Sequence, residues 1–447
     1  MAKYTAPRGT KDILPVEVGL WQFIEDNCRD IFFLYNYQEI RTPVFESTDL
    51  FARSIGSTTD IVKKEMYTFE DRKGRSLTLR PEATAAVVRA GLENNLIAPD
   101  SFTKLFYIGP MFRYERPQAG RQRQFHQAGV EVFGSADPLL DAEVIVMAVK
   151  LFDSFGLKEL RVDLNSVGCK KCQPGYRQAV QDYFRPKIGE MCADCRERLE
   201  SNPLRILDCK EPSCQPFLAN APASAQHLCE ECDLHFKKLL SYLDNAKVKY
   251  QINDRLVRGL DYYTKTAFEV VSSQLGSQNA VCGGGRYDNL VEELGGKATP
   301  AIGFAIGLER VVEVLKQAKL AGHDSRGLLL YFATIGEPAK KVAFDLLNKG
   351  RELGIPSDMD YTGKSLKAQM KAADRLKSQY VYIIGDDEVA KGAAVLKNME
   401  TSEEREVTFE NVLYQPFGLE GVKEESSCGG CGGGCGGGCS CGDSCDE

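Results

Sequence analysis

Arginines cluster in one short stretch of the chain, within and just after Tyr107–Pro117. Four of them stand at positions 113, 116, 121 and 123. Arg113 falls at the end of a predicted strand, and a guanidinium held on a strand suits bidentate contact with a phosphate. The arginines in the following loop are suited to reversible binding of a polyanion. A solvated charged hairpin is the alternative interpretation of the same pattern.

Two further stretches combine arginine with groups that bind rings or nucleotides. In Leu256–Thr264, Arg258 stands near Tyr262 and Tyr263, and a charged donor with two phenol groups suits a small polar ring. In Ala301–Arg310, glycines allow close approach of backbone, and Arg310 offers a planar face for an aromatic base. Each also has an ordinary interpretation: aromatic packing at a strand end, and a common strand-to-helix junction.

Half of the sixteen cysteines lie between Cys169 and Cys232. Three pairs have C-x-x-C spacing and two cysteines are more loosely spaced: Cys169 and Cys172, Cys192 and Cys195, Cys229 and Cys232, with Cys209 and Cys214 between. Where thiols stay reduced, such pairs indicate metal ligands, and eight thiolates suit two tetrahedral zinc sites. Spacing does not say which cysteines share a site. A small helical core with free, buried cysteines is the alternative.

The elements that must position these side chains follow from hydrophobic periodicity. Residues 17–37 predict an amphipathic helix that ends in aromatics, and Pro81–Gly91 predicts a helix with proline in its first turn. Leu105–Arg113 and Gln127–Phe133 predict two strands of a long antiparallel hairpin. The arginine-rich stretch therefore spans the end of one strand and the loop after it.

The middle of the chain changes character twice. Residues 168–240 combine cysteines, prolines and short helical pieces, which indicates a separate small module. Thr266–Val271 then predicts a strand, Gly283–Gly285 a turn, and Ala301–Ile306 a buried strand that continues into a helix.

Residues 327–420 follow the order strand, helix, helix, strand, which predicts a small α/β domain with a largely parallel sheet. The strands are 328–332 and 381–384, and the helices are 338–353 and 365–377. Lys364, Lys367, Lys371 and Arg375 are spaced three or four residues apart and share one helix face. Such a stripe suits contact with nucleic-acid phosphates, and a solvated face is the alternative.

Composition limits the class of protein. The chain has 447 residues and is 43% hydrophobic, enough for two to four domains with full cores. Its net charge of −7 argues against a protein that coats nucleic acid indiscriminately. We expect a cytosolic protein, since there is no apolar run of eighteen residues and no secretory signal. From residue 422 the chain is rich in glycine and cysteine, which predicts a disordered tail.

Together these stretches resemble the class II aminoacyl-tRNA synthetases. Arg113-Tyr114-Glu115 fits the core of motif 2, Gly307-Leu308-Glu309-Arg310 resembles the end of motif 3, and the region around Pro43 resembles motif 1. Those motifs indicate the class. The stretches Arg258–Tyr263 and Cys282–Leu290 look like the two signatures of histidyl-tRNA synthetase, bacterial type, and Arg8–Asp12 also fits. The resemblance extends from residue 4 to about residue 420.

The resemblance implies ATP-dependent ligation of L-histidine to tRNA(His), through histidyl-adenylate, with release of pyrophosphate and AMP and with Mg²⁺ on the phosphates. Arg113 and Arg258 would be catalytic and bind the α-phosphate. The histidine site would comprise Glu82, Thr84, Gln127, Glu131, Tyr262 and Tyr263. ATP would also contact Glu115, Arg121, Phe125 and Arg310. The tRNA would contact Gln118, Arg116, Arg123, Lys364, Lys367 and Lys371.

The resemblance also implies an α+β fold: an antiparallel sheet of six or seven strands with flanking helices, and a C-terminal α/β anticodon-binding domain. We expect a catalytic core in two parts, 1–167 and 243–324, interrupted by a cysteine-rich insertion at 168–242. The anticodon-binding domain would follow at 325–421 and the tail at 422–447. Because motif 1 forms the dimer interface in this class, a cytoplasmic homodimer is implied.

Two alternative hypotheses of function remain. A regulatory relative of the synthetases, which takes part in histidine biosynthesis without ligase activity, resembles the catalytic domain. It lacks the anticodon domain, whereas residues 327–420 are present here. A class II synthetase for glycine, proline or threonine would share the anticodon domain, and Arg258–Tyr263 argues against it.

Overall fold

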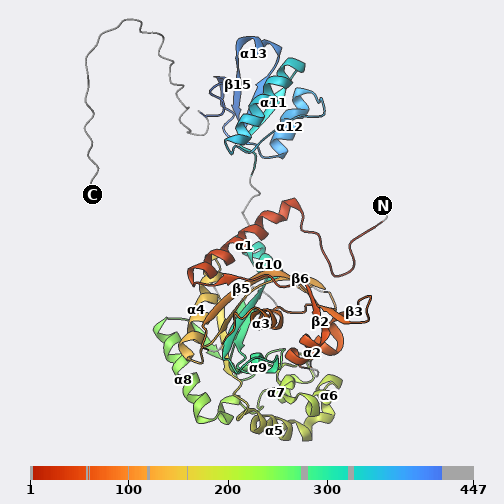
Figure 1. The fold of residues 1–447 in the computed structure, drawn as a ribbon, viewed down its shortest axis with the longest axis vertical. Helices are drawn as coiled ribbons and strands as arrows, with labels where there is room; N and C mark the ends of the chain where they lie inside the picture. The colour runs from red at the N-terminus through yellow and green to blue at the C-terminus, as the bar shows by residue number, and fades with distance from the viewer. Residues whose placement is uncertain are drawn as a thin grey trace, which may run out of the picture. The chain divides into compact units, whose positions relative to one another are not determined.

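The computed structural model describes residues 4–56, 59, 61–98, 100–117, 121–158, 160–272, 280–320 and 327–414. The chain divides into two compact units, Met1–Ser325 and Arg326–Glu447, shown in Figure 1. The predicted tail lies outside the described residues. None of the described helices is long and apolar enough to cross a membrane.

The first unit is built on an eight-stranded sheet in the order β1-β5-β6-β11-β10-β9-β7-β8. The six central strands pair antiparallel, while β1 and β8 add parallel edges. Both edge strands are very short, which is why the pattern of the sequence does not reveal them. The strands are β1 (Gln38–Glu39), β5 (Thr103–Phe112), β6 (Gln124–Phe133), β7 (Leu160–Ser166), β8 (Tyr250–Ile252), β9 (Thr264–Ser272), β10 (Ala280–Arg286) and β11 (Ala301–Gly307).

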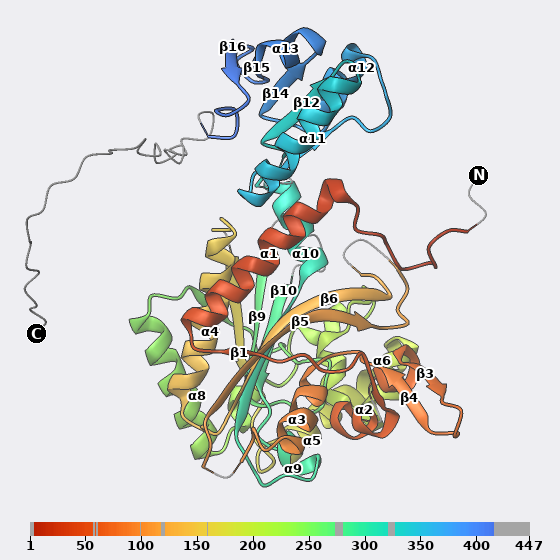
Figure 2. The same cartoon turned by 45° about the horizontal axis from the view of Figure 1, so that its top comes forward.

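Alternation along β6 divides the sheet into two faces. Ala128, Val130 and Val132 pack in the main core with helices α1 (Pro15–Leu34), α4 (Pro138–Ser154) and α10 (Leu308–Gln317). Phe133 joins a second core on the opposite face, with α3 (Thr84–Glu93) and α9 (Leu290–Glu293). Figure 2 shows α1 and α10 on one side of β5 and β6, and α3 on the other. The predicted helix at 17–37 and the predicted hairpin are confirmed.

A small sheet, β2-β4-β3, borders the α3 side of the first unit. Its strands are β2 (Phe45–Ser47), β3 (Tyr67–Glu70) and β4 (Ser76–Leu79), and α2 (Thr48–Ile55) and the π-helix η1 (Ile61–Glu65) connect β2 to β3. Arg80, just after β4, is buried and donates to the carbonyls of Pro110 and Thr42. It therefore ties the small sheet to the end of β5.

The cysteine-rich segment forms a helical module with its own core, which includes Tyr176, Val180, Leu199, Ile206 and Leu218. Helices α5 and α6 lie side by side in Figure 1. Its elements are α5 (Gln173–Phe184), η2 (Arg185–Glu190), α6 (Ala193–Ser201), η3 (Pro203–Asp208), α7 (Gln215–Leu218) and η4 (Ser224–His227). The next helix, α8 (Glu230–Asn245), packs against α4 and returns the chain to the main core.

The second unit has a five-stranded sheet in the order β13-β12-β14-β15-β16. Strands β13, β12 and β14 are parallel, and β15 and β16 extend the sheet antiparallel. The prediction found β12 (Leu330–Thr334), β14 (Tyr380–Ile384), α11 (Glu337–Glu352) and α12 (Leu366–Arg375). It missed the shorter or more polar elements β13 (Ser357–Met359), α13 (Asp386–Lys391), β15 (Ala393–Asn398) and β16 (Glu404–Thr408).

Two local predictions were wrong. Gly283–Gly285 lies inside β10 and not in a turn, because neighbouring atoms leave no room for side chains there. A Cβ on Gly284 would lie 2.4 Å from the carbonyl oxygen of Gly303. Pro81 precedes α3 and is not in its first turn. The carboxylate of Glu82 accepts the backbone N–H groups of Thr84 and Ala85, so the helix begins after it.

A buried ionic cluster joins strands and helices behind the sheet. Asp141 of α4 and Arg286 of β10 are both fully buried, with 2.6 Å between Oδ1 and Nη2. His235 of α8 and Thr266 of β9 also contact the Asp141 carboxylate, at 2.9 and 2.5 Å. Burial raises the pKa of Asp141, but Arg286 and His235 outweigh it and the net pKa is lowered. The cluster stays ionised and links four elements.

Replacing Asp141 with asparagine removes the nearer of the two carboxylates that pair with the buried Arg286 and leaves only Asp288 to offset its charge. We expect Asp141→Asn to lower the free energy of unfolding of the first unit by about 3–5 kcal/mol. Trp21, the single tryptophan, lies buried in α1 and reports on this unit in urea titrations followed by fluorescence. Asp153→Asn, on the same helix but exposed beside Lys150, is the matched control and should change little. A loss below about 1 kcal/mol for Asp141→Asn would contradict this account.

Candidate active site

Two adjoining cavities lie on the α3 side of the sheet. The inner one has a volume of about 80 Å³ and the outer one about 430 Å³. Both are lined by Arg113, Gln127, Arg258, Gly283 and Ala305. A molecule in the outer cavity therefore touches the same side chains as one in the inner cavity.

The inner cavity is organised around Glu131 of β6. Thr84 Oγ1 donates to Glu131 Oε1 at 2.7 Å, and the Tyr287 hydroxyl donates to Oε2. Gly303 on the neighbouring strand makes room for this carboxylate, since a Cβ there would lie 2.2 Å from Oε2. The cavity wall also includes the predicted residues Glu82, Tyr262 and Tyr263. The structure thus brings together all six predicted residues of the amino-acid site.

The carboxylates of the inner cavity are not ordinary acids. Burial raises the pKa of Glu131 to about 8, even though hydrogen bonds from Tyr287 and Thr84 oppose the shift, and nearby Glu82 adds to it. Burial also raises the pKa of Glu82. Glu131 can therefore change protonation near neutral pH, and it can act as donor or acceptor toward a ligand.

Two buried polar atoms at this site have no hydrogen-bond partner among the described residues: Oε1 of Gln127 and Nε of Arg258. Buried polar groups are rarely left without a partner. Both side chains line both cavities, which puts an unused acceptor and an unused donor where the cavities adjoin. This is the arrangement expected where a polar ligand completes the hydrogen bonding.

Arg113 and Arg258 reach the shared wall from different elements. Arg113 follows β5, donates from Nε to the carbonyl of Pro81 at 2.9 Å, and has its guanidinium 5.3 Å from the Phe125 ring centre. Arg258 pairs with Glu269 of β9. A Cβ on Gly283 would lie 2.1 Å from Arg258 Nη2, so glycine at that position admits the guanidinium.

The outer cavity holds the remaining residues of the predicted nucleotide site. Arg121 donates to Glu115 at 2.9 Å, and Arg113 lies 3.8 Å from the other oxygen of that carboxylate. Phe125 lines the cavity, as does Arg310, which donates to the carbonyl of Ala280. Arg113, Arg121, Arg258 and Arg310 all line this cavity, but carboxylates, among them Glu115 and Glu269, line it too, so its excess of positive charge is small.

The predicted nucleic-acid contacts lie elsewhere. Arg116 is exposed, and Arg123 stacks on Tyr114 with 3.9 Å between guanidinium and ring centre. Gln118 lies outside the described residues. Lys367, Lys371 and Arg375 are exposed on α12, while Leu366, Met370 and Ala373 pack inward. Lys364 precedes the helix, so it does not extend the stripe along it.

Sequence reasoning missed several residues of the site. Tyr287 holds Glu131, Tyr107 lines the inner cavity, and Glu269 pairs with Arg258. Tyr287 stands inside the second signature, so a signal existed although no role was assigned to it. Arg205 and Asp208 of the cysteine-rich module line the outer cavity, and no motif of the sequence points to them.

The eight module cysteines form two separate groups of four. One group is Cys169, Cys172, Cys229 and Cys232, and the other is Cys192, Cys195, Cys209 and Cys214. Within each group the sulfur atoms all lie within 4.8 Å of one another. None of the ten cysteines in the described part of the chain forms a disulfide. The first group joins the two ends of the module, and the second joins α6, η3 and α7.

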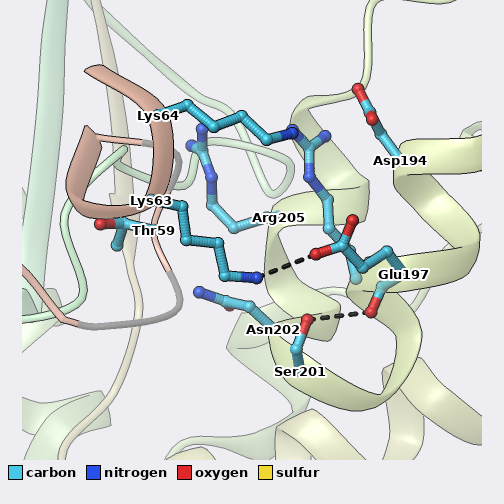
Figure 3. Close-up of a pocket in the computed structure, with 9 residues that line it drawn as sticks. Thr59, Lys63, Lys64, Asp194, Glu197, Ser201, Asn202 and Arg205 are labelled. Carbon is cyan, nitrogen blue, oxygen red and sulfur yellow. Dashed lines mark hydrogen bonds and ion pairs between the residues drawn. The ribbon is translucent and has the colours of Figure 1, made fainter.

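Side chains of the module also contact η1, as Figure 3 shows, and the loop before Tyr262. Lys63 pairs with Glu197 of α6 at 2.9 Å across a narrow pocket that Arg205 also lines. Asn202, which just precedes η3, donates to Asp261 at 2.8 Å. The module is therefore attached to the segments that border the active site.

Comparisons with known proteins show which family this chain resembles. The family described as histidyl-tRNA synthetase matches residues 9–311, and an anticodon-binding domain matches residues 330–414. A histidine–tRNA ligase of Desulforamulus reducens is 52% identical over 409 residues, which cover 92% of this chain and 98% of the relative. A histidine–tRNA ligase of Halothermothrix orenii is 53% identical over 410 residues, covering 91% and 97%.

Solved structures give the same result. The apo histidyl-tRNA synthetase of S. aureus has a TM-score of 0.78 and 40% sequence identity, covering 92% of this chain and 98% of that one. A Bacillus halodurans protein described as an ATP phosphoribosyltransferase regulatory subunit/histidyl-tRNA synthetase has a TM-score of 0.60. At 22% identity, over 86% of this chain and 99% of that one, it shows the fold alone.

The shifted pKa of Glu131 predicts a pH dependence of stability. An unfolded glutamate ionises near 4.5, whereas Glu131 in the folded chain ionises near 8. Between these values the unfolded chain releases a proton that the folded chain keeps, so stability falls as pH rises. We expect Glu131→Gln to abolish this contribution, so that wild type loses stability relative to the variant from pH 5 to pH 8.

The measurement is the urea midpoint of both proteins at several pH values, followed by Trp21 fluorescence. Glu93→Gln, which alters an exposed carboxylate beside Arg89, is the control and should follow wild type. If the urea midpoints of wild type and Glu131→Gln changed with pH in the same way, Glu131 would not be the source of the pH dependence.

Proposed function

The chain belongs to the histidyl-tRNA synthetase family, and from that premise we propose how its two cavities divide the substrates. It is a class II histidine–tRNA ligase, which joins L-histidine to tRNA(His) at the expense of ATP. In the first step the histidine carboxylate attacks the α-phosphorus of ATP and displaces pyrophosphate. In the second, the terminal ribose of the tRNA takes the histidyl group and AMP leaves. The shared wall of the cavities carries the proposal, since both reactants must meet there.

Histidine occupies the inner cavity in this proposal. Glu131 and Tyr263 contact the two imidazole nitrogens, while Glu82, Thr84 and Gln127 hold the α-amino group and Tyr262 closes the wall. The free Oε1 of Gln127 supports this, since an ammonium group would supply its missing donor. An apolar ring of similar size would leave Glu131 unsatisfied, which makes the site strongly selective for a polar ring.

Arg113 and Arg258 bind the α-phosphate in this proposal, at the wall between the cavities. Two guanidinium groups from different elements offset the negative charge that grows as the carboxylate attacks. The unused Nε of Arg258 supports this assignment. Both groups are held before the reaction, Arg113 by the Pro81 carbonyl and Arg258 by Glu269. Catalysis of this kind depends mainly on such positioning.

ATP extends into the outer cavity, with adenine between Phe125 and Arg310. Glu115 contacts the adenine amino group and Arg121 the outer phosphates. The pairs Arg121–Glu115 and Arg310–Ala280 must open for this, because each uses a group that ATP needs. Mg²⁺ would be held mainly by the phosphates, since Glu115 is assigned to adenine and Glu269 pairs with Arg258.

The tRNA contacts two regions in this proposal. Arg116, Arg123 and Gln118 face the acceptor end, and Lys364, Lys367 and Lys371 contact anticodon-arm phosphates. The exposed positions of Arg116, Lys364, Lys367 and Lys371 support it, while Arg123 is half-buried against Tyr114. A rise in the KM for tRNA in Lys367→Gln and Lys371→Gln, with unchanged pyrophosphate exchange, is the test for the second region.

We also propose a cytoplasmic homodimer. Val44, Phe45 and Phe69 expose apolar surface beside Pro43, in the region that resembles motif 1. Sedimentation analysis should therefore give twice the chain mass of 49.5 kDa. A cytoplasmic location is proposed because tRNA(His) and ATP are the substrates of this family's reaction.

Zinc is proposed for both cysteine groups. A tetrahedral site with Zn–S bonds of about 2.3 Å places the sulfurs about 3.8 Å apart. The measured separations are 3.6 Å for Cys169–Cys172, 3.9 Å for Cys169–Cys229 and 3.8 Å for Cys192–Cys209. The donor sets therefore fit the ion in type, number and spacing, and zinc would stabilise the small module.

The decisive test of the function is exchange of labelled pyrophosphate into ATP. We expect exchange with histidine and none with the other amino acids. Arg258→Ala should lower kcat for exchange about 10²-fold or more, since a donor to developing charge is lost. Arg177→Gln, an exposed arginine of α5, is the control and should match wild type. No exchange from folded protein with Mg²⁺ would favour the regulatory relative.

Metal analysis tests the zinc proposal. We expect two zinc ions per chain in purified protein, one in Cys195→Ser and one in Cys232→Ser, because each substitution removes one ligand of a different group. Chelation should lower the unfolding temperature of wild type. The proposal would be contradicted if the purified protein contained no zinc and gained no stability from added zinc.

A further inference from the structure

The wall of the outer cavity is not formed by the catalytic sheet alone. Arg205 and Asp208 of η3 line it, across from the arginines of the motif 2 hairpin. Both belong to the cysteine-rich module. The module therefore contributes charged groups to the proposed nucleotide site, in addition to any contact with tRNA.

The position of Arg205 is set by its flanking residues. Leu204, Ile206 and Leu207 are buried in the module core, which leaves the Arg205 side chain to point outward from η3. Asn202, at the start of this turn, donates to Asp261, and Arg205 Nη1 lies 3.9 Å from the position of a Cβ on Gly259. Arg205 is thus held beside the loop that carries Arg258.

The second cysteine group fixes the other end of this turn. Cys209 directly follows Asp208 and is one of the four sulfur donors, with Cys192, Cys195 and Cys214. Its backbone N–H donates to the carbonyl of Ile206 at 3.0 Å. A metal ion in this group would therefore restrain η3 relative to α6, and with it the direction of Arg205.

The guanidinium of Arg205 has capacity for a ligand. Its contact with Asp208, 3.7 Å between Nη1 and Oδ2, is an ion pair beyond hydrogen-bond distance. Within the described part of the chain its side-chain donors make no hydrogen bond, although the side chain is largely buried, with 21% of it exposed. It lines one cavity together with Arg113, Arg121, Arg258 and Arg310, and these five arginines outnumber the four carboxylates there, an excess that suits a phosphate ligand.

We propose that Arg205 binds a phosphate of ATP, and that the Cys192, Cys195, Cys209 and Cys214 group, with its metal bound, is the device that positions it. The inference rests on the proposed nucleotide site. It assigns to the insertion a role in adenylate formation, before tRNA binds. The same phosphate chemistry occurs at the tRNA acceptor end, and the two sources are separated by assaying exchange without tRNA.

The first experiment compares Arg205→Gln with wild type in histidine-dependent pyrophosphate exchange. We expect the KM for ATP to rise about tenfold, as for a lost charge-assisted hydrogen bond, while the KM for histidine stays the same. Arg205→Lys should recover part of the loss. Arg185→Gln, an exposed arginine of the same module paired with Glu200, is the matched control. Direct titration of ATP binding should reproduce the difference.

The second experiment tests the positioning role of the cysteine group. Cys195→Ser should lose one metal ion and weaken ATP binding, as Arg205→Gln does, and the double variant should be no weaker than either single variant. Cys232→Ser also loses one ion, but from the other group, so its ATP affinity should stay near that of wild type. Circular dichroism verifies that each variant is folded.

Three outcomes would overturn the inference. An unchanged ATP affinity in Arg205→Gln, with a raised KM for tRNA in aminoacylation, would assign the residue to the acceptor end. Unchanged values for both substrates would make Arg205 purely structural. Additive losses in the double variant would separate Arg205 from the cysteine group. Failure of the proposed function itself looks different, since wild type would then show no exchange.

Discussion

Glycines on β10 and β11 are the constraint on which the active site depends. The inner face of the sheet carries charged side chains that lie flat against neighbouring strands. Gly283 leaves room for Arg258 and Gly303 leaves room for Glu131, with hypothetical Cβ atoms only 2.1 and 2.2 Å away. Any side chain at these positions would displace Arg258 or Glu131, the groups proposed to contact the substrate. Glycine does not make the backbone flexible here, because β10 is paired with a strand on each side.

The polar groups on that face of the sheet do not find all their hydrogen-bond partners within the protein. Arg258 pairs with Glu269 but keeps an unused Nε, and Gln127 keeps an unused acceptor. Behind the sheet, by contrast, Arg286 bonds to Asp141, to Asp288 and to two backbone carbonyls, so its charge is fully compensated. The difference between the two faces follows from their roles. A structural charge needs all its partners within the protein, whereas a binding group must leave one for the ligand.

Sequence alone predicted the class of fold, the hairpin of β5 and β6, and the family, because those features are carried by contiguous motifs. It placed Arg113 and Arg258 in one site only through resemblance, since 145 positions separate them along the chain. It missed Tyr287 as the partner of Glu131, because that pairing arises from strand order. It mistook Gly283–Gly285 for a turn, because glycine is typical of turns and the close packing of strands is invisible in a pattern.

The module that interrupts the catalytic core had the least predictable role. Its cysteine spacing indicated metal, but the grouping into two sets needed the fold. Its ends meet at the first group, where Gln173, next to Cys172, donates to the carbonyl of Tyr263 at 3.2 Å. In its second group, Cys209 directly follows Asp208, which lies in the outer cavity wall. Each group thus adjoins a different substrate cavity. Because the core of this module is small, the two cysteine groups that join its segments also influence the geometry of both cavities.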